Sequence, residues 1–194
     1  VPRKQRKRRR LPGTSANGCV RHRATHRNPV WSYDFLTERT EDGRQLRILV
    51  VIDEFTWECL AIEVARSFTA CDVIMTLQYL FAVRGAPEHL RSDNGPEFVA
   101  LHFQDWLKRV GIQPLLIYPG SPWENGYNER FNGTLRREML NAEWFHSTKQ
   151  AQVAINTWLR QYNQIRPHHA LGMRPPVPET LLENDKISGT EKWG

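Results

Sequence analysis

Three acidic residues in a fixed order and spacing constrain this chain more than any other feature. Asp34 lies in the β-prone segment Val30–Thr37, Asp93 follows the short segment Pro87–Arg91, and Glu129 lies in a segment with helical periodicity. The 35 residues between Asp93 and Glu129 leave room for a helix, a strand and a connection into a second helix. We therefore expect two strands and one helix to supply the three carboxylates.

Carboxylates in this layout are typical of metal sites for phosphodiester chemistry. Two divalent cations can stabilise the charge that develops on both oxygens of an in-line displacement, and Mg²⁺ prefers carboxylate ligands. Taken alone, Asp34 fits an exposed strand position equally well, and Asp93-Asn94-Gly95 is typical of a turn. We favour the metal site because the end of the Asp93 strand is expected beside the middle of the Asp34 strand, about 4.8 Å away.

Hydrophobic periodicity predicts an α/β layer fold. The predicted strands are Val30–Thr37, Leu46–Asp53, Trp57–Val64, Pro87–Arg91 and Gly111–Tyr118, the first two joined by a turn at Thr40–Gly43. The predicted helices are Ala70–Arg84, Phe98–Val110, Asn125–Leu140 and Thr148–Asn163. In the last strand, Leu115, Leu116 and Ile117 are the expected buried residues.

The net charge of +6 is concentrated at one end of the chain. Residues 1–27 hold ten of the 27 Lys and Arg residues and no acid, which leaves 17 basic against 21 acidic residues in the remainder. The run that includes Arg8, Arg9 and Arg10 favours nucleic acid as a partner, because basic runs attract polyanions. A solvated linker is the alternative. We divide the chain into a basic tail (1–27), a core (28–165) and a proline-rich extension (166–194).

Cysteine usage and hydropathy bear on location. Three cysteines are an odd number and fit reduced thiols in the cytosol better than a disulfide framework. No signal peptide or membrane-spanning segment is predicted, so we expect a cytoplasmic protein. Because the chain begins with Val1, we also expect it to be part of a longer protein.

The predicted Asn125–Leu140 helix has two distinct faces. Its polar stripe is predicted to face DNA and metal, because asparagine has poor helix propensity and no advantage for solubility. The stripe consists of Asn125, Glu129, Asn132 and Arg136, and the second face of Tyr127, Phe131 and Leu135.

An ordered set of short motifs carries a family resemblance over about residues 28–179. The motifs are Trp31-Ser-Tyr-Asp-Phe, Val51-Ile-Asp-Glu, Arg91-Ser-Asp-Asn-Gly-Pro-Glu-Phe, Gly120-Ser-Pro-Trp-Glu-Asn-Gly-Tyr, Asn128-Glu-Arg-Phe-Asn-Gly, Tyr162-Asn, Arg166-Pro-His, Ala170-Leu-Gly and Pro175-Pro. In this set the chain resembles the catalytic half of bacterial insertion-sequence transposases of the second-reading-frame type. Their core is similar to that of retroviral integrases, the DDE recombinases.

The resemblance implies a fold, an activity and a site. The fold is ribonuclease-H-like, with a five-stranded mixed sheet flanked by helices. Asp34, Asp93 and Glu129 would bind two Mg²⁺ ions, with Mn²⁺ as a substitute, for strand nicking and strand transfer into target DNA. The DNA contacts we expect from these motifs and from the tail are Asn125, Asn132, Arg136, Arg166, His168, Arg8, Arg9 and Arg10.

The resemblance also implies partners. They are the element's terminal inverted repeats, target DNA, further copies of the chain on DNA, and a first-reading-frame protein, with no membrane. The expected location is the bacterial cytoplasm in association with the nucleoid.

Two positions depart from the family pattern, and two other functions stay open. Asn128 stands where the family more often has a β-branched apolar residue, and Arg130 stands where serine is usual. The alternatives are a non-catalytic DNA-binding remnant and a metal-dependent nuclease that cuts without joining.

Overall fold

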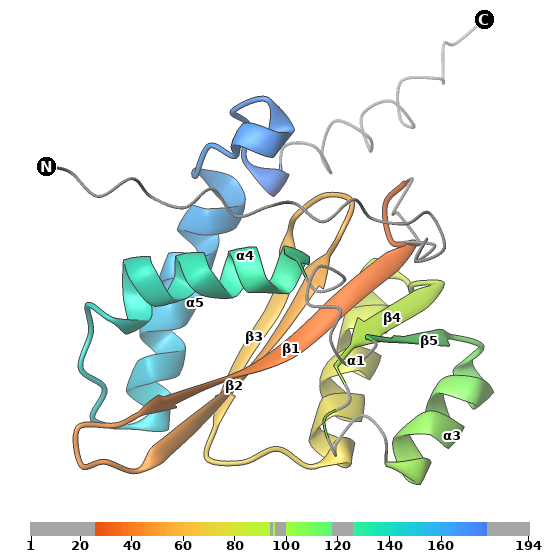
Figure 1. Cartoon of the computed structure of the whole chain (residues 1–194), viewed down its shortest axis with the longest axis horizontal. Helices are drawn as coiled ribbons and strands as arrows, with labels where there is room; N and C mark the ends of the chain where they lie inside the picture. The colour runs from red at the N-terminus through yellow and green to blue at the C-terminus, as the bar shows by residue number, and fades with distance from the viewer. Residues whose placement is uncertain (1–25, 94, 96–99, 118–125, 178–194) are drawn as a thin grey trace, which may run out of the picture.

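A computed structural model describes residues 26–93, 95, 100–117 and 126–177. They form one five-stranded sheet in the order β3-β2-β1-β4-β5, with helices on both faces (Figure 1). Strands β1 (Val30–Arg39), β2 (Gln45–Asp53) and β3 (Cys59–Ala65) are antiparallel neighbours. Strands β4 (His89–Ser92) and β5 (Gln113–Leu116) run parallel to β1. The sheet is therefore mixed, as predicted.

The β1–β2 hairpin closes through the predicted turn. The amide of Thr40 donates to the carbonyl of Arg44 at 2.9 Å, and that of Gly43 donates to the carbonyl of Thr40 at 2.8 Å. Gly43 has φ +80°, a conformation that glycine adopts without a Cβ penalty. The hairpin fixes the register that pairs Asp34 with Val50.

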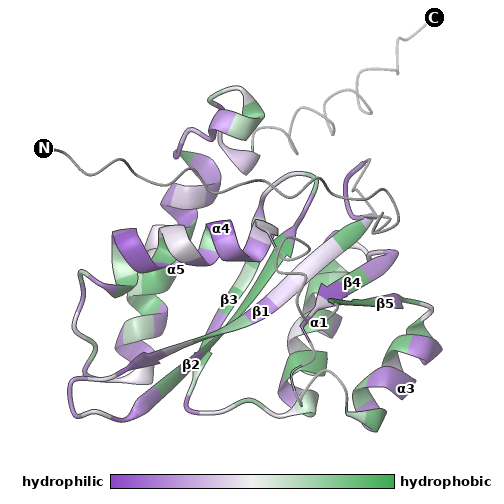
Figure 2. Ribbon diagram, viewed as in Figure 1, coloured by the Kyte–Doolittle hydropathy of each residue, from purple (hydrophilic) through white to green (hydrophobic). Residues whose placement is uncertain are grey.

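Alternation along the strands divides the core into two layers. On one face, Leu36 of β1 and Ile48 and Val50 of β2 pack against α4 (Gly126–Leu135), the π-helix η3 (Arg136–Leu140) and α5 (Thr148–Gln164). On the other face, Trp31 and Tyr33 pack against α1 (Ala70–Arg84) and α3 (Leu101–Val110). Hydrophobic residues accordingly follow the strands and the adjacent helix surfaces (Figure 2). Asp34, one residue after Tyr33, shares the α4 face.

Helix α1 has the predicted bounds because its caps are encoded locally. Thr69 and Asp72 form a reciprocal capping box, and Gly85 follows the last helical residue with φ +82°. Helix α5 also begins as predicted, with Ser147 accepting a hydrogen bond from the amide of Gln150 at 3.1 Å.

Several predicted boundaries were wrong. The third strand begins at Cys59 rather than Trp57, because Trp57 has φ +64° inside the β2–β3 turn. The strand after Gly111 begins at Gln113, and its residues are not the buried set we predicted: Leu115 and Ile117 are half-buried and Leu116 is exposed. Its position at the edge of the sheet explains their exposure.

The helix predicted to end at Leu140 consists of an α-helix followed by a π-helix. It is α-helical to Leu135 and continues as the π-helix η3, whose extra residue per turn shifts the phase of the side chains. In the segment after α5, His169–Leu171 form a 3₁₀ helix (η4), and His168 pairs with Arg174 in an isolated β-bridge. Residues 98, 99, 118 and 125, which we placed in predicted elements, lie outside the described residues.

Candidate metal and DNA site

The pairing of β1 with β4 brings two of the three acids together. Val30 pairs with His89, Trp31 with Leu90 and Ser32 with Arg91. Each pair is offset by 59 positions, so the same register continued to Asp34 reaches Asp93. Adjacent strands lie about 4.8 Å apart, and neighbours in register point to the same face. Asp93 thus follows the carboxyl end of β4, beside the middle of β1.

Contacts of Tyr33 support this continuation of the register. The Tyr33 side chain is hydrogen-bonded to that of Ser92, the residue it would pair with. Burial raises the pKa of the Tyr33 hydroxyl, and the neighbouring charge of Asp93 raises it further, although the Ser92 hydrogen bond opposes both effects. The two strands therefore stay adjacent up to the acids.

Asp93 also has a local structural role. Its Oδ1 accepts a 2.9 Å hydrogen bond from the amide of Gly95, the Asx-turn geometry that the Asp-Asn-Gly sequence indicates. The turn and the metal-ligand interpretations are compatible, because a carboxylate has two oxygens and several lone pairs.

Helix α4 is tied directly to Asp34. The side-chain amide of Asn132 donates to Asp34 Oδ2 at 2.9 Å, while Asp34 Oδ1 accepts from the amide of Phe35 at 2.7 Å. Asn132 is only 7% exposed, and within the described residues its Oδ1 has no hydrogen-bond partner. The helix thus packs against β1 with a buried side-chain amide against the first acid.

Glu129 lies one turn before Asn132 on α4 and is exposed. Among the described residues, no three His, Cys, Asp or Glu side chains are close enough together to hold a metal ion. The donor types fit a hard divalent cation, because Asp34, Asp93 and Glu129 offer only carboxylate oxygens. The first two are adjacent in the continued register, and Glu129 lies on α4, the helix that Asn132 ties to Asp34.

A buried ion pair supports the strand that leads to Asp93. Arg91 Nη1 lies 3.2 Å from Glu54 Oε1, and the two side chains are 6% and 1% exposed. Glu54 comes from the β2–β3 turn, and its backbone amide bonds to the carbonyl of Val30 at 3.1 Å. Arg91 lies two residues before Asp93. Its pair with Glu54 therefore joins the end of β4 to the β2–β3 turn and, through the Glu54 amide, to the start of β1.

The predicted DNA contacts occupy varied environments. Arg136 donates to the carbonyl of Thr37 at 3.1 Å and lies 3.6 Å from Glu38, so it ties η3 to β1. His168 is 8% exposed, and its Nε2 lies 3.2 Å from the carbonyl of Tyr162. Asn132, already described, is buried beside Asp34. Asn125 and Arg8, Arg9 and Arg10 lie outside the described residues.

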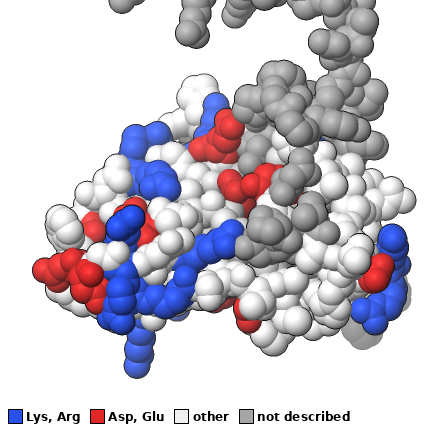
Figure 3. Space-filling view, turned by 60° about the horizontal axis from the view of Figure 1, so that its bottom comes forward, with Lys and Arg blue, Asp and Glu red and all other residues white. Residues whose placement is uncertain are grey.

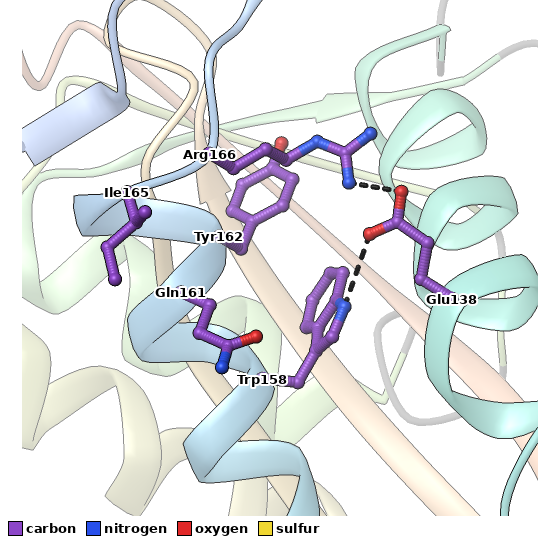
Figure 4. Close-up of a pocket in the computed structure, with 6 residues that line it drawn as sticks. All are labelled: Glu138, Trp158, Gln161, Tyr162, Ile165 and Arg166. Atoms are coloured by element: carbon purple, nitrogen blue, oxygen red, sulfur yellow. Dashed lines mark hydrogen bonds and ion pairs between the residues drawn. The ribbon is translucent and has the colours of Figure 1, made fainter.

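Arg166 lines a pocket of about 330 Å³ between η3 and the end of α5. It forms an ion pair with Glu138, and Glu138 also accepts a 3.3 Å hydrogen bond from the Trp158 indole (Figure 4). Tyr162, Gln161 and Ile165 complete the lining. Glu138, Arg166 and Trp158 thus join η3 to the end of α5.

Charge is mixed on one face of the described residues. On the face shown in Figure 3, basic and acidic side chains are interspersed over one half, and uncharged side chains cover most of the remaining described surface. The strongest concentration of positive charge in the sequence is in residues 1–27.

Two models of the integrase core domain match this sequence, over residues 24–122 and 110–176. The chain belongs to the integrase core family of insertion-sequence transposases. It is 42% identical over 150 residues to a protein of insertion element IS476 from Xanthomonas euvesicatoria. The match covers 77% of this chain and 43% of the relative. A protein of IS407 from Burkholderia multivorans is 38% identical over 77% of this chain and 54% of its own length. The chain thus spans about half the length of these relatives.

Solved structures confirm the ribonuclease-H-like fold. The catalytic core domain of BIV integrase has a TM-score of 0.61 at 23% identity, and the match covers 83% of this chain and 98% of that one. The HTLV-2 integrase catalytic core, solved in complex with magnesium, has a TM-score of 0.59 at 22% identity, covering 76% and 93%. At these identities, the likeness establishes the fold.

Sequence reasoning missed two features of the site. It predicted that Asn132 faces DNA and metal, but it did not predict the hydrogen bond from Asn132 to Asp34; the signal was its position three residues after Glu129, at the spacing that joins one helical turn to the next. It also assigned Trp57 to a strand, although the ring packs against α4. No pattern in the sequence indicated that contact.

Proposed function

We propose that this chain is the catalytic core of a transposase that nicks DNA at the ends of its element and joins those ends to target DNA. The observation that supports the proposal is the convergence of β1, β4 and α4: the β1–β4 register, if continued two residues, pairs Asp34 with Asp93, and Asn132 ties the helix that bears Glu129 to Asp34. Membership of the integrase core family supports a polynucleotidyl transferase.

Asp34, Asp93 and Glu129 would hold the divalent cations, two Mg²⁺ ions with Mn²⁺ as a substitute. The magnesium complex of the HTLV-2 core supports this assignment. Bound cations would stabilise the charge that develops on the attacking and leaving oxygens. Asn132 would keep Asp34 in one orientation, because its amide fixes Oδ2 while the Phe35 amide fixes Oδ1. The exposed position of Glu129 leaves it to complete the set when the substrate is bound.

The proposed DNA surface combines the α4 face with the basic tail. Arg136 and Arg166 have guanidinium groups that are partly exposed, with side chains 41% and 36% accessible. Arg8, Arg9 and Arg10 would contribute contacts to phosphates from outside the described residues. Asn125 stays a proposed contact, whereas Asn132 and His168 would have to leave buried positions to reach DNA. A chain that lacks residues 1–10 should show a shallower salt dependence of DNA affinity.

The assembly would contain DNA ends and more than one copy of the chain. One neighbour with the same fold is part of a retroviral intasome, with a TM-score of 0.66 at 21% identity. A first-reading-frame partner remains a prediction. In the described part of the chain, no helix is both long and apolar enough to cross a membrane.

A strand-transfer assay tests the proposal and separates it from its alternatives. Labelled duplex DNA that carries the element's terminal repeats is incubated with target plasmid and Mg²⁺ or Mn²⁺. Label joined covalently to the plasmid would support a transposase core. Nicks without joined label would indicate a nuclease, and DNA binding without either product would indicate a non-catalytic remnant.

A further inference from the structure

An aromatic and cationic cluster lies next to Glu129, outside the set of carboxylates. The Trp57 ring meets the Tyr127 ring edge-on, with centroids 5.2 Å apart at 76°. The guanidinium carbon of Arg130 lies 5.3 Å from the centroid of the Trp57 ring. Tyr127 and Arg130 are three residues apart on α4 and flank Glu129 in the sequence, so the cluster borders the helix that carries the third acid.

The turn that presents Trp57 is held firmly. Asp53 Oδ1 accepts from the amides of Phe55 at 2.8 Å and Thr56 at 3.2 Å, and the amide of Trp57 donates to the carbonyl of Asp53 at 2.9 Å. This pinned turn keeps Trp57 at φ +64°, a conformation that bulky side chains rarely adopt. Such conformations persist where the surroundings impose them, and they are concentrated at functional sites.

The exposure of the cluster fits a binding surface better than a core. Trp57 and Tyr127 are half-buried, Arg130 is exposed, and Phe55, two residues before Trp57, is 37% exposed. On β1, the carbonyl of Val30 accepts a hydrogen bond from the amide of Glu54 in this turn. Val30 lies four residues before Asp34, a distance of about 13 Å at the strand rise of ~3.3 Å per residue. A nucleotide on the cluster would therefore lie within a few nucleotides of the carboxylates.

We propose that Trp57, Tyr127 and Arg130 form a stacking platform for an unpaired nucleobase near the end of the DNA strand that is processed. Aromatic faces bind bases of any sequence by stacking, and an adjacent arginine adds attraction to the ring and to phosphate. This occupant matches the charge and the aromatic character of the cluster. The inference rests on the proposed function, because it requires DNA at the carboxylates.

The test compares two labelled duplexes of equal length, one fully paired and one with three unpaired bases at its end. Stacking of a single base contributes enough for a preference of roughly 5- to 100-fold for the unpaired end. We expect the wild-type chain to show that preference and Trp57→Ala to lose it, while affinity for the paired duplex changes less than about twofold. A 2-aminopurine at the unpaired position should be quenched by the wild type and not by Trp57→Ala.

Matched variants separate stacking from folding. Trp144→Ala removes a tryptophan that is 76% exposed and lies beyond η3, so it should keep the preference. Trp57→Phe retains a ring against Tyr127 and should keep part of it. Arg130→Gln, a change at an exposed position, should weaken binding to the unpaired end even if Trp57→Ala does not fold.

Two outcomes would overturn the platform. They are equal wild-type affinity for both duplexes, or a preference that survives in folded Trp57→Ala or in Arg130→Gln. Metal-dependent nicking measured on the same preparations distinguishes a failure of the stacking platform from a failure of the proposed function. Nicking without a preference overturns the platform alone, whereas a wild-type chain that binds neither duplex and does not nick overturns the proposed function and the platform with it.

Discussion

The side-chain amide of Asn132 donates a 2.9 Å hydrogen bond to Oδ2 of Asp34, which joins helix α4 to the middle of strand β1. The contact spans 98 positions of the sequence and is made by a residue that is 7% exposed. It fixes both the orientation of the first acid and the position of the helix that carries Glu129. One amide thus links the two parts of the candidate site.

Asn132→Ala should lower DNA nicking more than it lowers stability. Loss of a group that orients a metal ligand typically reduces activity or metal affinity by about 10- to 100-fold. The free energy of unfolding should fall by only about 1.5–3 kcal/mol, the size expected for a hydrogen bond to a charged group. Nicking rates over a Mg²⁺ titration and urea unfolding measure the two effects. Asn141→Ala, at an exposed position beyond η3, is the control, and equal nicking by both variants would contradict the role of Asn132.

Arg91→Met should destabilise the fold strongly, because it leaves Glu54 buried without its partner. Removing one member of a buried ion pair typically costs about 3–5 kcal/mol. The double change Arg91→Met with Glu54→Leu should recover much of that loss. Denaturant unfolding is the measurement, with Asp105→Asn as the control, since the Asp105–Lys108 pair is exposed and should contribute about 0–1 kcal/mol. Similar losses in Arg91→Met and Asp105→Asn would refute this account of the buried pair.

Acid should weaken the packing at the end of α5 through His168. Burial lowers the pKa of the His168 imidazole, the positive charge of Arg166 lowers it further, and the carbonyl of Tyr162 and the charge of Glu138 oppose these effects. The unfolded chain therefore binds a proton more readily, so this contribution to stability is complete above about pH 6.5. It is lost as the pH falls through the lower pKa of the folded state.

Melting temperatures of the wild type and of His168→Gln between pH 7.5 and 5 check this prediction. The wild type should lose stability faster than His168→Gln on acidification, because only the wild type can protonate this buried ring. His169→Gln, at the exposed neighbouring position, should follow the wild-type profile. Parallel profiles for the wild type and His168→Gln would show that His168 does not titrate with unfolding.

The exposed side of α1 should mediate self-association. Met75, Tyr79 and Val83 are 59%, 68% and 54% exposed and recur every four residues. Met75 and Val83 each lie four residues from Tyr79 along the helix. If two α1 helices packed antiparallel about a two-fold axis at Tyr79, Met75 of one copy would face Val83 of the other, and no charged residues would be opposed. We expect light scattering to detect a dimer that Tyr79→Lys dissociates and Lys149→Ala does not. A monomer at high concentration would contradict this interface.

The sequence predicted those parts of the fold that local signals encode. Helix α1 had the predicted bounds because Thr69, Asp72 and Gly85 cap it, and the β1–β2 hairpin formed at Gly43. The predictions failed where tertiary contacts decide. Leu116 is exposed because β5 is an edge strand, and the Glu129 helix becomes a π-helix at Arg136, where η3 packs between β1 and α5.

The candidate site was predictable in its residue types but not in its contacts. Asp93 follows β4 as predicted, and the register with β1 brings it to Asp34. Helical periodicity placed Asn132 on the same stripe as Glu129, but it could not identify Asp34 as the hydrogen-bond partner, because a polar residue on a half-buried helix can face solvent or a buried carboxylate. Among the described residues Glu129 does not form a metal-binding group with the other two acids, and we propose that it joins them only when DNA and metal are bound.

The most direct measurement is the Mg²⁺-dependent nicking of terminal-repeat DNA by the wild type and by Asp34→Asn, Asp93→Asn and Glu129→Gln. Circular dichroism and DNA binding are recorded on each variant to show that it is folded. We expect the wild type to nick and each variant to lose nicking while it keeps its fold and its nonspecific DNA affinity. Wild-type nicking by any one of the folded variants would contradict the assignment of that carboxylate to the metal site.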